Sequence, residues 1–433
     1  MRYTPLPAEL FTANRRRLQA LLPPRALVLV QANDVLPTNA DGMLGFVQNS
    51  DLYHLSGIDQ EETILLLFPD APDPRQREIL FVRETNEQIA LWEGAKLTRE
   101  QAAARSGIGR ICWLHEFEGV FRQCMCQAGP VYLNGNEHPR AVIETETREL
   151  RFARRCRREY PLHDLRRLAP LMHELRLVKQ PAEIDALREA MRITGDGFRR
   201  VCRFVRPGVH EYEVEAELAH EFLRQRAGGF AYPPIIASGA SACVLHYHSN
   251  DAECRDGDLL LLDVAAKYAN YNADLTRTIP VSGRFTPRQR QVYQAVLNVF
   301  RAACDLLRPG VLLREYQEEI GRLMTSELIG LGLLDRDAVE KQDPDNPLFK
   351  KYFPHGTSHH LGIDVHDVGA TWEPLRAGMV LTVEPGIYIR EEDIGIRLEN
   401  DILIGETANT DLMADIPIEP DAIESLMAEG RAG

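Results

Sequence analysis

The stretch GDLLLLDVAAKYANYNADLTRTIPV, residues 257–281, decides the fold of the C-terminal part of this chain. It opens with a continuous apolar run, which is typical of a buried strand and which ends at Asp263. A second strand-like run follows and carries Asp274. In a hairpin, residues at this separation can face the same side across a turn, which we place at residues 267–270. Two aspartates are therefore expected close together, although Asp263 taken alone could simply end a buried strand.

The same layout recurs about 120 residues later. GMVLTVE runs from Gly378 to Glu384, with the same offset of six residues between the glycine and the acid. A second strand-like run, GIRLENDILI, then carries Glu399. This repeated layout predicts two related halves that face one another, each offering two carboxylates from a hairpin-like unit.

Acids in apolar strands create a charge problem. An unpaired carboxylate in an apolar environment costs several kcal/mol or takes up a proton. Two divalent cations would neutralise four carboxylates. The sequence therefore predicts a two-metal site, whose candidate ligands are Asp263, Asp274, His359, Glu384 and Glu399.

Histidines gather between the acid-bearing runs. The segment HGTSHHLGIDVHDVG (355–369) holds His355, His359, His360 and His366, which are four of the 13 histidines in the chain. Imidazole is the commonest neutral metal ligand and a natural proton carrier near neutral pH. The alternative is a set of ordinary loop histidines, which the clustering beside glycines makes less attractive. His360 is expected to point away from the site.

Length and composition set the class of protein. With 433 residues the chain is too long for one ordinary core, so two domains are expected. Its formal net charge of −14 argues against nucleic acid or an anionic membrane as the main partner. The eight cysteines form no C-x-x-C pair or disulfide framework, and no secretory signal or membrane-spanning run is visible. A cytoplasmic protein is therefore expected.

The first third of the chain alternates apolar strands with helical patterns, which predicts an α/β domain. Strands are expected at residues 26–32, 63–68 and 78–83, and helices at 98–107 and through the Arg-rich stretch 148–180. Pro181 and Glu183 suit the first turn of a new helix. We therefore predict domains at residues 1–174 and 175–433.

The C-terminal motifs resemble those of the methionine aminopeptidase, prolidase and aminopeptidase P superfamily. The resemblance rests on LLDVAAKYANYNADLTRTIP, HGTSHHLGIDVHDVG, VEPGIYI and GIRLEND, and it covers residues 175–420. It implies the "pita-bread" fold, whose two pseudo-symmetric halves hold a dinuclear metal site. Asp274 and Glu399 match the ligands that bridge the two metals in the family.

The resemblance also implies roles for residues that are not metal ligands. His246, His355 and His366 match the family's substrate-contacting histidines, and His246 is preferred to His248 mainly on this ground. Arg397 matches an arginine beside the ligands, and Glu384 is the candidate both for metal binding and for handling the nucleophile's proton. The hard, carboxylate-rich ligand set favours Mn²⁺.

The N-terminal motif FVQNSDLYHLSGID (46–59) resembles the creatinase-like N-terminal domain of bacterial aminopeptidase P. This resemblance implies a metal-dependent Xaa-Pro aminopeptidase that acts on peptides with proline at the second position, as a homodimer or homotetramer. Phe230, Tyr232 and Tyr388 are candidates to line a proline pocket, although ordinary core is the stronger expectation for Phe230. Two alternatives stay open: a prolidase limited to Xaa-Pro dipeptides, and a non-catalytic binding protein with the same fold.

Overall fold

The computed structural model describes residues 3–141 and 144–431 of the chain. The described residues form two compact units, which meet in sequence between Arg176 and Leu177. The sequence placed the boundary between residues 174 and 175, two residues earlier. Each unit is described by itself below.

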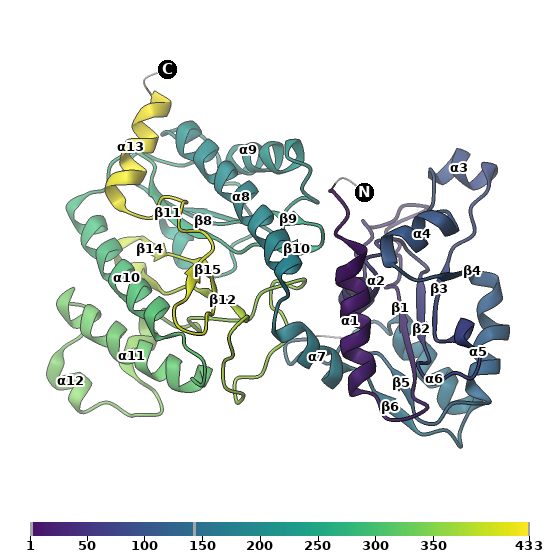
Figure 1. Ribbon diagram of the computed structural model, residues 1–433. Coiled ribbons are helices and arrows are strands. Elements are labelled where there is room, and N and C mark those ends of the chain that lie inside the picture. The colour runs from purple at the N-terminus through teal and green to yellow at the C-terminus, as the bar shows by residue number, and fades with distance from the viewer. Residues whose placement is uncertain (1–2, 142–143, 432–433) are drawn as a thin grey trace. The chain divides into compact units, whose positions relative to one another are not determined.

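The N-terminal unit is built on a six-stranded mixed sheet with the strand order β4-β3-β2-β1-β5-β6 (Figure 1). The three strands predicted from the sequence are confirmed as β1 (Leu27–Gln31), β2 (Ile64–Leu67) and β3 (Glu78–Val82). The sheet also contains β4 (Arg110–Trp113), β5 (Val131–Leu133) and β6 (Leu165–Arg167). Successive residues of β1 enter two different cores, because Val28 and Val30 pack on one face of the sheet and Leu27 and Leu29 on the other. Both faces are covered, which explains why these strands read as continuous apolar runs.

Helices cover both faces of this sheet. Residues of α1, α2, α4 and α7 join the core of Val28, whereas residues of α5 and α6 join the core of Leu27. The helices are α1 (Ala8–Leu21), α2 (Ser50–Ser56), α3 (Glu87–Glu93), α4 (Arg99–Ser106), α5 (Phe117–Met125), α6 (Arg148–Glu159) and α7 (Ala169–Leu177). The helix expected over 148–180 is corrected by the structure, because β6 interrupts it and adds the last strand of the sheet.

The C-terminal unit has two halves of similar layout, each with two long helices followed by antiparallel strands (Figure 1). The first half contains α8 (Pro181–Phe204), α9 (Glu211–Arg224), β7 (Ile235–Ser238), β8 (Leu259–Asp263), β9 (Lys267–Tyr268), β10 (Tyr271–Asn272) and β11 (Thr276–Pro280). The second contains α10 (Pro287–Leu306), α11 (Leu313–Gly330), α12 (Arg336–Glu340), β12 (Val380–Val383), β13 (Gly386–Ile389), β14 (Ile394–Arg397), β15 (Asn400–Leu403) and β16 (Thr410–Asp411). Helix α13 (Pro420–Arg431) follows.

The two halves meet at a seam beside the predicted metal site. An isolated antiparallel bridge pairs Thr276, at the start of β11, with Glu399, between β14 and β15. Next to it, Thr278 exchanges hydrogen bonds with the backbone of Arg397, at 3.3 Å in each direction. The strands of both halves are therefore joined where their acidic residues lie.

Two details of the predicted hairpins are wrong. Asp274 and Glu399 lie just outside the strands that were expected to carry them, and the backbone N–H of Asp274 donates to the carboxylate of Asp401 instead of to a ladder partner. The turn is also shorter than 267–270, because Ala269 and Asn270 alone take left-handed backbone angles, with φ of 48° and 63°. Two such residues in succession are typical of a tight hairpin turn.

Among the helices in residues 3–141 and 144–431, none combines the length with the apolar character that a bilayer-spanning helix needs. The eight cysteines are all free thiols, and six of them are buried.

Helix α8 packs closely against its neighbours at Gly197, and this contact can be tested. A Cβ atom added at Gly197 would lie 2.7 Å from the ring of Phe222 in α9. We expect Gly197→Ala to destabilise the C-terminal unit in urea unfolding, by about 1–3 kcal/mol, because overpacking outweighs the helix propensity of alanine. In the matched control Gly330→Ala, the added atom meets nothing within 4 Å, so stability should stay unchanged or rise. Equal behaviour of the two variants would refute the close contact.

Candidate active site

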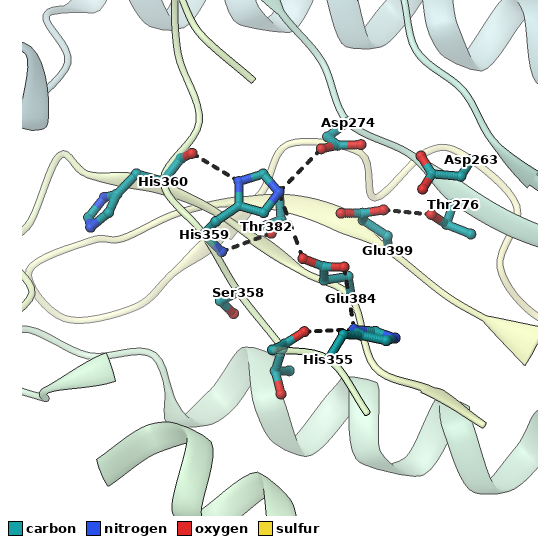
Figure 2. A network of polar contacts seen from close by, with 12 residues as sticks. Asp263, Asp274, Thr276, His355, Ser358, His359, His360, Thr382, Glu384 and Glu399 are labelled. Atoms are coloured by element: carbon teal, nitrogen blue, oxygen red, sulfur yellow. Dashed lines mark hydrogen bonds and ion pairs between the residues drawn. The ribbon is translucent and has the colours of Figure 1, made fainter. Parts of the chain in front are cut away.

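Carboxylates from both halves converge on one imidazole at the seam. Ligand atoms of Asp274, His359 and Glu399 all lie within 4.8 Å of one another. The Nε2 atom of His359 lies 3.4 Å from a carboxylate oxygen of Asp274 and 3.7 Å from one of Glu384 (Figure 2). Asp274 and Glu399 are buried, whereas His359 and Glu384 keep small exposed fractions, so the centre is within reach of solvent.

The backbone holds His359 in a fixed orientation. Its N–H donates to the hydroxyl of Thr382 at 3.1 Å, and its carbonyl accepts the N–H of Thr382 at 2.9 Å. Its Nδ1 lies 3.0 Å from the carbonyl oxygen of His360. A carbonyl only accepts, so Nδ1 carries a proton, and Nε2 is the nitrogen that faces Asp274 and Glu384.

The two glutamates are positioned by their own main chains. The N–H of Glu384, directly after β12, donates to Thr357 at 2.8 Å. The N–H of Glu399 donates to the carbonyl of Thr276 at 3.0 Å, and the hydroxyl of Thr276 donates to the Glu399 carboxylate at 2.6 Å. The side chain of Glu399 is thus held from the opposite half of the unit (Figure 2).

Tyr232 joins the two aspartates. Its hydroxyl lies 2.7 Å from Asp263 and 2.6 Å from Asp274. A phenol has one proton to donate, so the two carboxylates compete for, or share, the same O–H. Asp263 ends β8 and is paired with Thr276 in the sheet, which brings it to the same end of the strands as Asp274.

Arg397 connects several site residues with one guanidinium. It donates to Asp263 at 2.5 Å, to the hydroxyl of Tyr388 at 2.8 Å and to the hydroxyl of Thr276 at 3.2 Å. The last contact continues to Glu399 through the hydroxyl of Thr276. Arg397 therefore orients acids of both halves and supplies one permanent positive charge.

His355 lies on the other side of Glu384. Its Nδ1 is 2.8 Å from the carbonyl of Gly356 and 3.7 Å from Glu384, and its Nε2 is 2.8 Å from the hydroxyl of Tyr388. Burial, helped by the charge of Arg397, lowers the pKa of His355 to about 3. The imidazole is therefore neutral, with Nδ1 as donor and Nε2 as acceptor.

The remaining predicted histidines lie at the edge of the site. The ring of His366 packs edge-on against the ring of His359, with a centroid distance of 4.5 Å and an angle of 88°. His246 is exposed and lies near His355, whose pKa its charge lowers, and its ring is roughly parallel to that of His248. Within the described residues, His246 makes no hydrogen bond to the acids.

The carboxyl groups of the centre have raised pKa values. Burial, reinforced by a neighbouring carboxylate, raises the pKa of Asp274, Glu384 and Glu399 well above their ordinary values. The neighbours are Asp263 for Asp274, Glu399 for Glu384, and Asp274 for Glu399. Groups of like charge are thus held together out of water, and one arginine cannot balance them all.

This donor set fits divalent cations. Oxygen and imidazole ligands suit hard or intermediate ions such as Mn²⁺, and the absence of thiolates disfavours soft ones. Ligands about 2.1 Å from one ion lie at most about 4.2 Å apart, so shifts of under about 1 Å would close the observed cluster around an ion. The further pair of acids, Asp263 and Glu384, offers donors for a second ion.

Sequence reasoning missed the hydroxyl groups that hold the acids. Tyr232 was expected only as a pocket residue, and Thr276 and Thr382 were not considered. The alternation of strand residues could have found both threonines, since Thr276 is two residues from Asp274 and Thr382 is two residues from Glu384. Nothing local to the sequence of Tyr232 reveals its contact with both aspartates. Phe230 packs on Phe222 but is only half-buried.

Known proteins match both units of the chain. Residues 185–406 match the family described as "Metallopeptidase family M24", and residues 11–132 match "Aminopeptidase P, N-terminal domain". An Xaa-Pro aminopeptidase of Escherichia coli is 37% identical over 438 residues, which cover 96% of this chain and 98% of the relative. Xaa-Pro aminopeptidase 3 of Homo sapiens is 30% identical, over 93% of this chain and 81% of the relative.

Solved structures agree with these matches. The structure of a putative aminopeptidase P from Bacillus anthracis superposes with a TM-score of 0.90 at 33% identity, covering 98% of this chain and 99% of that one. Aminopeptidase P from E. coli with the inhibitor Pro-Leu gives a TM-score of 0.88 at 34% identity, covering 99% of this chain and all of the other. The fold class predicted from the sequence, an α/β N-terminal domain followed by a pita-bread domain, is confirmed, and the chain belongs to metallopeptidase family M24 with the N-terminal domain of aminopeptidase P.

Proposed function

We propose that this protein removes the N-terminal residue from peptides that carry proline at the second position, and that it uses two divalent metal ions to do so. This proposal rests on one observation. Five residues from both halves converge on one centre: Asp263, Asp274, His359, Glu384 and Glu399. The names of the relatives support the Xaa-Pro substrate class. Family membership supports metal dependence.

The ions, most simply Mn²⁺, would be held by these five residues and would supply a nucleophile from water at neutral pH together with polarisation of the scissile carbonyl. Glu384 borders the centre, is partly exposed and has a raised pKa, so it suits the role of accepting the proton of the attacking water and returning it to the leaving amine. Arg397 keeps Asp263 and Glu399 in place during these transfers.

The histidines suit substrate binding rather than proton transfer. His355 is neutral, and its ring is fixed between Tyr388 and Gly356. His366 packs on His359 and the exposed His246 lies near His355, so both are placed to hold the peptide and the charge that develops on its carbonyl. We assign these roles to His246, His355 and His366, with Tyr388 beside His355.

We also propose that the protein works in the cytoplasm as a homodimer or homotetramer. The eight free thiols support a reducing compartment. The oligomeric state is inferred from the resemblance of the sequence to aminopeptidase P, and size-exclusion chromatography with light scattering would measure it.

Substrate length decides between the two proline-specific reactions. We expect Xaa-Pro-Yaa peptides to be cleaved with release of the first residue in the presence of Mn²⁺, and matched Xaa-Ala-Yaa peptides to be cleaved much more slowly. Mass spectrometry of the products measures both rates. Turnover confined to Xaa-Pro dipeptides would identify a prolidase instead. Undiminished turnover after exhaustive chelation would exclude a metal-dependent reaction.

Substitution of Glu384 tests its proposed role. Glu384→Gln keeps the shape of the side chain but removes its capacity to take up a proton, so kcat should fall about 100-fold or more. Glu318 is exposed on α11, so Glu318→Gln is the matched control and should keep the parent rate. A Glu384→Gln variant with the kcat of the parent would exclude Glu384 as the proton carrier.

Substitutions of His246 and His248 provide a second pair of variants. His246→Ala should lower kcat/KM by about 10-fold or more, because it removes a polar contact to the reacting carbonyl. His248→Ala changes the neighbouring, parallel ring and should leave kcat/KM within a few-fold of the parent. The opposite ranking would assign the substrate contact to His248.

The raised pKa values predict how metal stabilises the protein at different pH. A carboxyl whose pKa is higher in the folded state binds more protons folded than unfolded, so the metal-free protein should lose stability as pH rises above about 4. Metal displaces those protons. The rise in Tm caused by saturating Mn²⁺ should therefore grow between pH 5 and pH 7.5, with proton release in calorimetry. A pH-independent rise in Tm would contradict this account.

A further inference from the structure

A buried ion pair joins the segment that carries the histidines to the residues just before α8. The Nζ atom of Lys179 is 2.9 Å from Oδ2 of Asp367, and each side chain is only 1% exposed. Such a pair is often no more stabilising than apolar residues of the same size, because both charges lose their hydration. Its presence so close to the site therefore calls for an explanation other than stability.

Asp367 and His359 meet at one atom. The carbonyl oxygen of His360 accepts the N–H of Asp367 at 2.9 Å and the Nδ1–H of His359 at 3.0 Å. The placement of Asp367 therefore sets the acceptor that orients the ring of His359. Asp367 also directly follows His366, whose ring packs edge-on against that of His359.

The segment is folded tightly onto the ion pair. A Cβ atom at Gly362 would lie 2.1 Å from Oδ2 of Asp367 and 3.0 Å from Cε of Lys179. A Cβ atom at Gly369 would lie 1.9 Å from the ring of His360. Glycine is required at both places because the backbone passes directly over the charged groups and the buried ring.

Lys179 is itself anchored to the second half of the unit. Its backbone N–H donates to the carbonyl of Gly378 at 2.9 Å, two residues before β12. The C-terminal end of β12 leads into Glu384, and its Thr382 holds the backbone of His359. One lysine thus ties the histidine segment to the strand that presents two other site residues.

We propose that Lys179 and Asp367 are a positioning pair for the reaction. The pair fixes the segment of residues 360–369, so that His359 offers Nε2 to the metal and the ring of His366 stays packed against the ring of His359. The assignment of His366 rests on the proposed function. The orientation of His359 rests on the contacts above.

Removing both charges together separates positioning from stability. Lys179→Met and Asp367→Asn each leave one buried charge without its partner, so each should lower Tm strongly. The double variant removes both charges of the pair and should recover most of the lost Tm. If the pair positions His359, the double variant should still need about 10–100-fold more Mn²⁺ for half of the Mn²⁺-induced rise in Tm, as is usual for a lost support of a metal ligand. Its kcat/KM should stay at least 10-fold below that of the parent.

The control is an ion pair in the same unit that does not contact the histidine segment. Arg288 and Glu392 lie 2.7 Å apart at the surface, and Arg288→Met with Glu392→Gln should leave the Mn²⁺ titration unchanged. A Lys179→Met/Asp367→Asn protein with the Mn²⁺ titration and kcat/KM of the parent would overturn the proposal. A parent that binds Mn²⁺ but does not cleave Xaa-Pro peptides would refute the proposed function alone, because the Mn²⁺ titrations still decide whether the pair positions His359.

Discussion

The seam between Thr276 and Glu399 is the constraint on which the site depends. Carboxylates repel one another, so chains that bring them together must hold each one by contacts stronger than this repulsion. At the seam, the main chains of Thr276 and Glu399 are bridged, and the Thr276 hydroxyl fixes the Glu399 carboxylate. The neighbouring Asp274 is held by its backbone N–H on Asp401. The seam thus fixes the main chains of Asp274 and Glu399, and the Thr276 hydroxyl also fixes the carboxylate of Glu399.

A second arginine, Arg277, reinforces this seam. Arg277 is completely buried and donates to the carbonyls of Thr276 and Glu399, at 2.9 and 2.7 Å, and to the side chain of Asn400 at 2.7 Å. Its partners there are neutral, so its charge is left to act on the acids nearby. The two arginines therefore differ in role, since Arg397 binds Asp263 directly whereas Arg277 holds the main chains of both halves together.

The sequence predicted the acids of the site better than their supports. Asp263 and Glu384 follow apolar strands, so pattern alone marks them as unusual, and repetition of the pattern predicts two halves. The exact strand limits around Asp274 and Glu399 could not be predicted, because they depend on a bridge between residues more than 100 positions apart. The role of Tyr232 could not be predicted for the same reason, since only the folded chain brings its hydroxyl to both aspartates. The interruption of the Arg-rich helix by β6 likewise depends on pairing with β5.

Duplication explains why four acids can share one centre without losing the fold. Each half delivers its first acid, Asp263 or Glu384, at the end of a buried strand, and its second acid where a strand has just ended or is about to begin. The backbone N–H groups of both second acids donate across the seam, that of Asp274 to the carboxylate of Asp401 and that of Glu399 to the carbonyl of Thr276. His359 approaches on a segment fixed by Thr382 rather than by either pair of acids. The predicted ligands are therefore supported mainly by groups outside the ligand set, which include backbone groups, hydroxyls, the guanidinium of Arg397 and the carboxylate of Asp401.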